Sequence, residues 1–381
     1  MILLEKPYVS DFLIETIRKN NFSVLDNEVA REYFSAAELT SKEEAIEKYK
    51  NENELFYANS ENAISFIFEN LKNTKLDKMI NLSKDKAAFR EALKNLYPKY
   101  YFKKVDFSSL KNINPEKIPY PVILKPNVGF LSFGVYPIIS KEVWEKTILK
   151  LEEDIKKFEN IFPKNVVNTA DFIIEEMIEG DEFALDAYFD KNGEATILNI
   201  YQHPFFDGDD VSDRVYFTSK KIIQKYHDKF KKLLDDLAKS LDFKDFPFHL
   251  ELRANEKNII PIEINPLRFC GWCITDLAYF SWGINVYEAY FNQTKPNWDE
   301  ILSKKDDDFY YFTIPDIPNN IDRSKIKEIN FEKYLKNIKN PLEIRKIDYS
   351  KNPIFAITFA KTPTMEEIKF LLGDDTGKYI S

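Results

Sequence analysis

Strand-like and helix-like hydrophobic patterns alternate along the chain. The first hundred residues contain short apolar runs typical of strands, at MILLEKPYV, FSVLD and LFYAN. Amphipathic stretches such as SDFLIETIRKN and ENAISFIFENLKN separate these runs, with apolar residues at the helical period. This order predicts an α/β layer structure for the N-terminal part.

The middle of the chain repeats a strand, loop, strand pattern. The segment PYPVILKPNVGFLSFGVYPII predicts one such pair, and DFIIEEMIEGDEFALDAYF predicts another. A strongly amphipathic helix, KIIQKYHDKFKKLLDDLAKSLDF, follows further on. The segment NPIFAITFAKTPTMEEIKFLL near the C-terminus predicts a small α/β unit.

The segment FPFHLELRANEKNIIPIEINP predicts a β-hairpin with residues 256–258 at its turn. In this register Glu251 lies opposite Glu263, and His249 lies opposite Asn265. Two carboxylates that face each other across a hairpin repel unless a cation lies between them. An all-oxygen face of two carboxylates and an amide suits Mg²⁺, which completes its shell with phosphates and water. His249 alone would suggest zinc, but the neighbouring acids favour the harder ion.

Composition narrows the classes of function. The 381 residues are 44% hydrophobic and 31% charged, which is typical of a folded protein with two to four domains. The net charge of −9 argues against nucleic acid as the main partner. No apolar run approaches the length of a membrane span, and the N-terminus has no basic region or small-residue cleavage site. We therefore expect no membrane association and a cytoplasmic protein.

Two cysteines, Cys270 and Cys273, form a Cys-x-x-Cys motif between an apolar strand and an expected helix. This is the context of a thioredoxin-type redox pair. A thioredoxin fold would need its own sheet around the motif, and two thiolates cannot complete a four-thiolate zinc site. The favoured interpretation is two small buried side chains at a turn, with redox chemistry as the alternative.

Other polar positions have a structural as well as a functional interpretation. The chain has nine glycines, and Gly129 and Gly134 lie in one loop, which favours either close approach of backbone to a ligand or a simple hairpin turn. Lys125 ends an apolar strand and needs an anionic partner. Glu182 can bind two ribose hydroxyls or lie on the surface. Arg214 follows Asp213 and can form a local ion pair. No Gly-x-Gly-x-x-Gly is present, so a Rossmann dinucleotide site is not expected.

These segments, in this order, resemble the ATP-grasp superfamily of carboxylate-amine ligases, from about residue 80 to residue 295. The resemblance implies an α/β fold whose two lobes hold ATP between antiparallel sheets. It implies a division into an N-terminal pre-ATP-grasp α/β domain (1–82), a small lobe with a phosphate lid (83–185), a large lobe with the metal site (186–295) and a C-terminal α/β appendage (296–381).

The resemblance also implies roles for individual residues. It implies that the phosphates are bound by Lys86, Lys125 and the lid with Gly129, Ser132 and Gly134. It implies that adenine and ribose are bound by Glu175, the hinge Met177 and Ile178, and Glu182. The metal ligands for Mg²⁺, or Mn²⁺, are Glu251, Glu263 and Asn265. Arg214 and Arg268 resemble the cations around the γ-phosphate and the acyl-phosphate, although Leu267 places Arg268 one residue later than in many members.

The implied reaction activates a small carboxylate as an acyl-phosphate with ATP and joins it to an amine. No protein nucleophile is needed. Alternatives are a carboxylase or carbamoyl-phosphate-type kinase, and an ATP-binding regulatory protein without catalysis. The expected partners are small carboxylate and amine substrates, together with a second copy of the chain, since many relatives are dimers.

Overall fold

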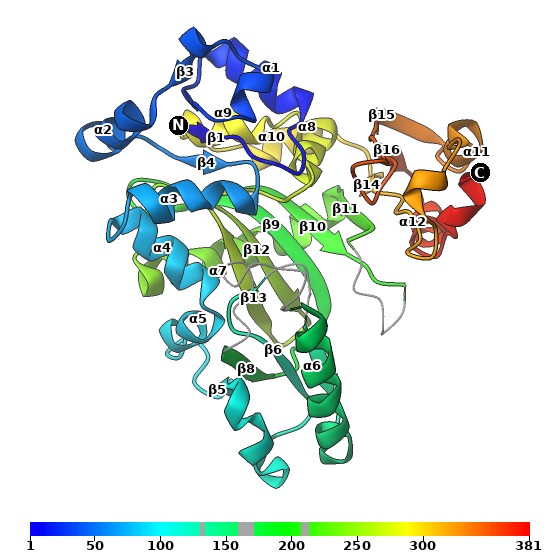
Figure 1. Cartoon of the computed structure of the whole chain (residues 1–381). Helices are drawn as coiled ribbons and strands as arrows, with labels where there is room; N and C mark the ends of the chain where they lie inside the picture. Colours follow the sequence, from blue (N-terminus) through cyan, green and yellow to red (C-terminus); the bar gives the residue numbers. More distant parts are fainter. Residues whose placement is uncertain (130–133, 159–170, 207–212) are drawn as a thin grey trace.

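The computed structural model describes residues 1–129, 134–158, 171–206 and 213–381. These residues form three β-sheets with helices packed around them (Figure 1). No helix within these ranges combines the length and the apolar character needed to cross a membrane.

The N-terminal domain is built on a parallel sheet. Its strand order is β3 (Leu39–Thr40), β2 (Val24–Leu25), β1 (Ile2–Leu3) and β4 (Tyr57–Ala58). Helices α1 (Asp11–Asn20) and α2 (Lys42–Glu52) connect the strands. Helix α1 begins where the Ser10 side chain accepts a hydrogen bond from the Leu13 amide, which satisfies one of the free N–H groups of the first turn. The strand order reverses between β1 and β4, the place in such sheets where loops frame a crevice.

The N-terminal domain packs against two helices from a distant part of the chain, α8 (Leu277–Trp282) and α9 (Val286–Phe291), which α10 (Trp298–Ser303) follows. Figure 1 shows these helices beside α1 and β1. The Asn285 amide donates to Thr16 Oγ1 at 2.8 Å, and Lys19 Nζ lies 2.9 Å from Glu288 Oε1.

The small lobe follows helices α3 (Ser65–Asn70), α4 (Lys75–Lys84) and α5 (Lys86–Ala92). Its antiparallel sheet has the order β5 (Phe102–Asp106), β8 (Asp171–Glu176), β6 (Val122–Pro126) and β7 (Tyr136–Ile138). Helix α6 (Trp144–Phe158) covers this sheet, and the core between them holds Trp144, Ile148 and Leu151.

The large sheet has eight antiparallel strands in the order β13-β12-β9-β10-β11-β14-β16-β15. Its first five strands are β13 (Ile259–Pro266), β12 (Phe246–Ala254), β9 (Asp181–Phe189), β10 (Ala195–His203) and β11 (Val215–Ser219). The predicted amphipathic helix is α7 (Lys220–Leu241), which buries Ile223, Phe230 and Leu234 in the core.

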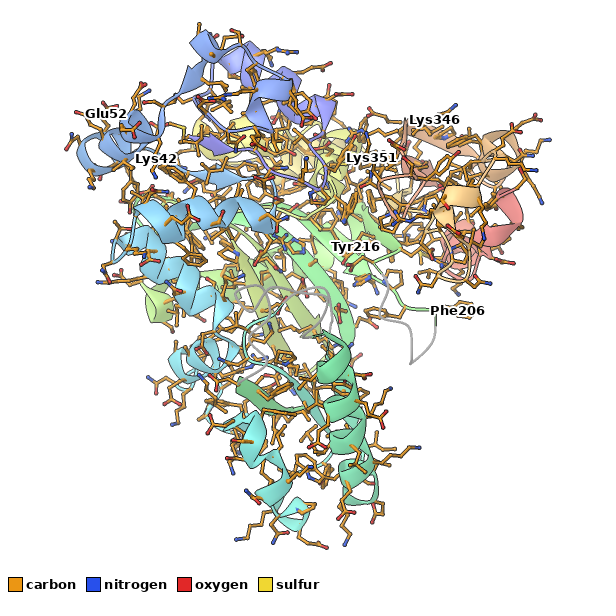
Figure 2. All side chains as sticks on the ribbon, in the orientation of Figure 1. Lys42, Glu52, Phe206, Tyr216, Lys346 and Lys351 are labelled. Atoms are coloured by element: carbon orange, nitrogen blue, oxygen red, sulfur yellow. The ribbon has the colours of Figure 1, made fainter. Side chains whose placement is uncertain are left out.

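The C-terminal segment continues the large sheet with β14 (Phe309–Thr313), β15 (Asn340–Lys346) and β16 (Ala356–Thr362), and adds α11 (Phe331–Leu335) and α12 (Met365–Leu372). Figure 2 shows Lys346 and Lys351 of this segment far from Lys42 and Glu52, the ends of α2. The predicted boundary at residue 185 falls within β9. Because β9 lies entirely in the large sheet, the change from small to large lobe comes between β8 and β9.

Candidate active site

The predicted hairpin is present as β12 and β13, and its register at the predicted site residues is the predicted one. Glu251 pairs with Glu263, and His249 pairs with Asn265. Beyond Glu251 the register shifts, so that Leu252 pairs with Pro261. Asn265 Nδ2 donates to Glu251 Oε1 at 3.0 Å, which links two of the three predicted metal ligands. An amide and two carboxylates therefore lie together at the outer strand pair of the large sheet.

Neighbouring strands add further polar residues to the same face. In register, Ala184 lies beside Glu251 and Asp186 lies beside His249, since β9 pairs with β12. Asp186 is fully buried, and its Oδ1 is 2.8 Å from His249 Nδ1. On β10, His203 stacks on Tyr216 of β11, which Figure 2 labels, with ring centroids 4.1 Å apart. Because side chains of alternate residues share a face, Glu251, Asp186 and His203 lie on the same face of the large sheet.

Two cations approach the trio from different directions. Lys86 Nζ lies 2.9 Å from Glu263 Oε2 and 3.2 Å from the Gly129 carbonyl oxygen. Arg268 donates from Nη2 to Asn265 Oδ1 at 2.7 Å. The Arg268 Nε also lies 3.4 Å from Glu61 Oε2, and Glu61 follows β4 of the N-terminal domain. The trio thus lies where the N-terminal domain, α5 and the large sheet meet.

The two opposed carboxylates have different electrostatic environments. Burial and the charge of Glu263 raise the pKa of Glu251 well above its usual value. Burial alone would also raise the pKa of Glu263, but the charges of Lys86 and Lys125 outweigh it and lower that pKa to about 2. Two neighbouring acids with opposite shifts are typical of a functional site.

Helix α5 is positioned to deliver Lys86. The Asp85 side chain accepts a hydrogen bond from the Ala88 amide and begins the helix. Asn127, which follows β6, accepts from the Lys86 amide through its carbonyl oxygen at 3.1 Å and from the Ala87 amide through Oδ1 at 2.9 Å. Lys84 instead pairs with Glu61. The structure therefore places Lys86, and not the nearby Lys84, beside Glu263.

Glu175 is buried between two cations. Arg90 Nε donates to its Oε2 at 2.8 Å, and Lys125 pairs with its Oε1. Arg90 also donates to the carbonyl oxygens of Pro261 and Ile262, so it connects the small lobe to β13. Burial would raise the pKa of Glu175, but Arg90 and Lys125 overcome it and lower the pKa to about 2. Lys125 thus has the anionic partner that its position requires.

The predicted hinge follows Glu175. The Met177 amide donates to the Pro121 carbonyl oxygen at 3.0 Å, and the chain turns at Gly180 before β9 begins. Glu182, the second residue of β9, is bonded by Arg253 and lies 3.2 Å from His203 Nδ1. Lys125, the hinge and Glu182 border the same junction between the two lobes.

Residues 118–276 match the family model described as the ATP-grasp domain. The chain carries an ATP-grasp domain. The predicted family and the predicted α/β fold class are confirmed.

Solved structures with this fold resemble nearly the whole chain. The L-amino acid ligase of Bacillus licheniformis aligns with a TM-score of 0.63 at 14% identity, over 97% of this chain and 94% of the other. Phosphoribosylglycinamide synthetase of Anaerococcus prevotii aligns with a TM-score of 0.60 at 18% identity, over 100% and 98% of the chains. Biotin carboxylase of Campylobacter jejuni aligns with a TM-score of 0.60 at 11% identity, over 92% of this chain and 84% of the other. A search of curated proteins by sequence found no match.

Some predicted site residues do not contact the Glu251 and Glu263 carboxylates, and one lies outside the described residues. Arg214 donates to the carbonyl oxygens of Leu372 and Asp374 and pairs with Asp316, so it binds the C-terminal segment. In the predicted lid, Gly129 and Gly134 flank the loop, and Gly134 has a φ of +75°. Ser132 lies outside the described residues.

The two thiols of the ATP-grasp domain are buried in a tight turn after β13. Burial raises the pKa of both Cys270 and Cys273 well above the usual thiol value, so both carry a proton at neutral pH. Arg345 Nη1 lies 3.0 Å from Cys273 Sγ. Protonated, enclosed thiols are poor nucleophiles, which favours the packing interpretation.

The donor set of the domain fits a hard metal ion. In the part of the chain that the structure describes, no three Asp, Glu, His or Cys side chains converge as a metal centre. The set here is two carboxylates and one amide, all oxygen donors, as Mg²⁺ prefers. Glu251 and Glu263 are half-buried opposite each other, so a divalent cation between them would remove the repulsion that helps to raise the pKa of Glu251.

Sequence reasoning missed residues whose partners are far away along the chain. Arg90 pairs with Glu175, and Arg253 bonds Glu182, 85 and 71 residues away. Asn127, which bonds the first turn of α5, and Glu61, which pairs with Arg268, were not predicted either. Arg253 could have been found, because it lies on the same strand face as Glu251, two residues along the predicted hairpin.

Proposed function

We propose that this protein is an ATP-dependent carboxylate-amine ligase that activates a small carboxylate as an acyl-phosphate. The observation that carries the proposal is the opposed pair Glu251 and Glu263, joined to Asn265 and bordered by Lys86 and Arg268. A cluster that combines acids and cations in this way suits a reaction in which negative charge moves between phosphoryl oxygens.

For the nucleotide, we assign the phosphates to Lys86, Lys125 and the lid with Gly129, Ser132 and Gly134. Contacts that support this are the bond from Lys86 to the Gly129 carbonyl oxygen and the closeness of both lysines to the acidic pair. We assign the contacts with adenine and ribose to Glu175, Met177, Ile178 and Glu182, which border the junction between the small and large lobes.

Glu251, Glu263 and Asn265 would hold Mg²⁺, or Mn²⁺. The ion supplies positive charge that neutralises phosphoryl oxygens and orients them. In this structure Lys86 pairs with Glu263. When ATP binds, the Lys86 ammonium group can move from this carboxylate to a phosphate, because both groups offer anionic oxygens. Lys86 thereby keeps the buried carboxylate compensated before the nucleotide binds.

We assign the carboxylate substrate to the side of the cluster where Arg268 lies, next to Glu61 of the N-terminal domain. Its oxygen attacks the γ-phosphorus, ADP leaves, and an acyl-phosphate forms. The amine then attacks the acyl carbon, phosphate leaves with the bonding electron pair, and the amine loses a proton. Arg268 has a guanidinium whose pKa stays raised, because the charges of Glu61, Glu251 and its other acidic neighbours outweigh burial, so it stays cationic through both steps. Arg214 remains a prediction, and its contacts support a structural role at the C-terminal segment.

The test is phosphate release from ATP and Mg²⁺ with pools of amino acids, small carboxylic acids and bicarbonate. We expect release that requires one carboxylate and one amine, and a loss of about a hundredfold or more in Glu263→Gln. Glu256→Gln is the matched control, since Glu256 lies exposed at the turn of the same hairpin. Release with bicarbonate alone would favour a carboxylase. ATP binding without release in any pool would favour a regulatory protein.

A further inference from the structure

The end of strand β12 contacts the hinge between the two lobes at several points. Arg253 Nη1 donates to the Ile178 carbonyl oxygen at 3.2 Å, and Asn255 Nδ2 donates to the Glu179 carbonyl oxygen at 3.4 Å. At Gly180, a Cβ atom would lie 2.5 Å from the Ala254 carbonyl oxygen, so only glycine allows this approach. The hinge is therefore held against residues 253–255.

Arg253 bonds Glu182 as well as the hinge. Its Nε and Nη2 both donate to Glu182 Oε2, each at 3.1 Å. The two residues are register partners on β12 and β9, so the strand pairing itself brings them together. One guanidinium thus contacts the backbone of the proposed adenine hinge and the carboxylate proposed for the ribose.

These contacts orient the Glu182 carboxylate and leave it able to accept a further hydrogen bond. A carboxylate has about four acceptor positions on its two oxygens. Arg253 takes two of them on Oε2, and His203 Nδ1 lies 3.2 Å from Oε1. The Arg253 side chain is one-third exposed and that of Glu182 is 13% exposed, so the pair borders solvent rather than the core. Oε1 keeps acceptor capacity for a hydroxyl group.

We infer that Arg253 is a positioning residue for the nucleoside, which sets the place of Glu182 relative to the hinge and so gives the site its preference for a ribose over a deoxyribose. This inference rests on the proposed function, since it assumes that ATP binds at the junction. Loss of the guanidinium removes both donors to Glu182 Oε2 and leaves its carboxylate free to change its rotamer, whereas the Asn255 bond to Glu179 and the close approach of Gly180 to Ala254 remain.

The experiment is calorimetric titration of the full-length protein with Mg²⁺ and either ATP or 2′-deoxy-ATP. The variants are Arg253→Met, which keeps the apolar stem, and Arg253→Lys, which keeps the charge without the fork. Arg31→Met is the matched control, because Arg31 pairs with Asp26 on the exposed surface of the N-terminal domain. Thermal melts of all variants establish that the protein stays folded.

We expect wild type to bind ATP about tenfold more tightly than 2′-deoxy-ATP, as one hydrogen bond to a charged group implies. In Arg253→Met this ratio falls towards one, with an intermediate ratio in Arg253→Lys and the wild-type ratio in Arg31→Met. An equal loss of affinity for both nucleotides in Arg253→Met, or no loss, would overturn the inference while leaving the ligase proposal intact. Absence of ATP binding in the wild-type protein would contradict both this inference and the ligase proposal.

Discussion

Lys84 and Lys86 are two residues apart and pair with different acids. Lys86 contacts Glu263 and the lid carbonyl of Gly129, whereas Lys84 pairs with Glu61. We expect Lys86→Met to lower kcat for ATP-dependent phosphate release at least about a hundredfold, because a phosphate contact made in the transition state is lost. Lys84→Met should cost less than about tenfold, since Glu61 keeps Arg268 as a partner. Equal effects of the two substitutions would contradict this assignment.

Glu175 has a pH-dependent effect on stability that can be given a sign. Its pKa in the folded protein is about 2, below the usual value of 4.5. The stabilisation is therefore present above about pH 4.5 and is lost as the pH falls towards 2. Its size is about 3 kcal/mol from the shift. Glu175→Gln should lower the free energy of unfolding at pH 7 by about that amount and flatten its change between pH 5 and 3, because Arg90 and Lys125 lose their buried anion.

Urea unfolding at a series of pH values measures this effect. Glu91→Gln is the control, because Glu91 is an exposed acid on the same helix as Arg90. The assignment would be contradicted if Glu175→Gln unfolded with the same midpoint as wild type at pH 7.

The turn into β9 depends on its glycine. Gly180 has a φ of +120°, and a Cβ there would lie 2.5 Å from the Ala254 carbonyl oxygen. Gly283, at the end of α8, has a φ of +74° and open space around it. We expect Gly283→Ala to cost about 1 kcal/mol from backbone strain alone. Gly180→Ala should cost at least about 3 kcal/mol and weaken ATP binding, because the backbone of β12 must move. Similar unfolding midpoints for the two variants would exclude a special role for the close approach.

Elements with a local signal could be predicted from the sequence. The β12/β13 hairpin combines alternating polar residues with a polar turn, and the Glu251/Glu263 pairing predicted by counting outward from residues 256–258 is confirmed, although the register between this pair and the turn differs by one residue. Helix α7 was predictable from its period. Pairings between distant segments were not, because no local pattern encodes them. The pairing of Arg90 with Glu175 was therefore not predictable, and neither were the contacts of Arg214 with residues 372 and 374.

At the scale of the whole molecule, the C-terminal segment is part of the main sheet. The β14 strand pairs with β11 along five residues, from Val215 with Thr313 to Ser219 with Phe309. A truncation that removes residues 305–381 should therefore expose the edge of β11 and apolar surface that Phe312 and Phe359 now cover. We expect the truncated protein to aggregate or to lose its cooperative thermal transition. A monodisperse truncated protein with the wild-type melting temperature would show that the segment is an independent appendage.

The central claim is that a substrate carboxylate becomes an acyl-phosphate at the Glu251, Glu263 and Asn265 cluster. The most direct measurement uses a carboxylate substrate labelled with ¹⁸O in both oxygens, incubated with ATP, Mg²⁺ and the amine, with mass analysis of the released phosphate. The account predicts one ¹⁸O in each phosphate released, because the carboxylate oxygen that attacks the γ-phosphorus leaves with it. Phosphate without label would show that water attacks ATP directly, and the ligase mechanism would be wrong.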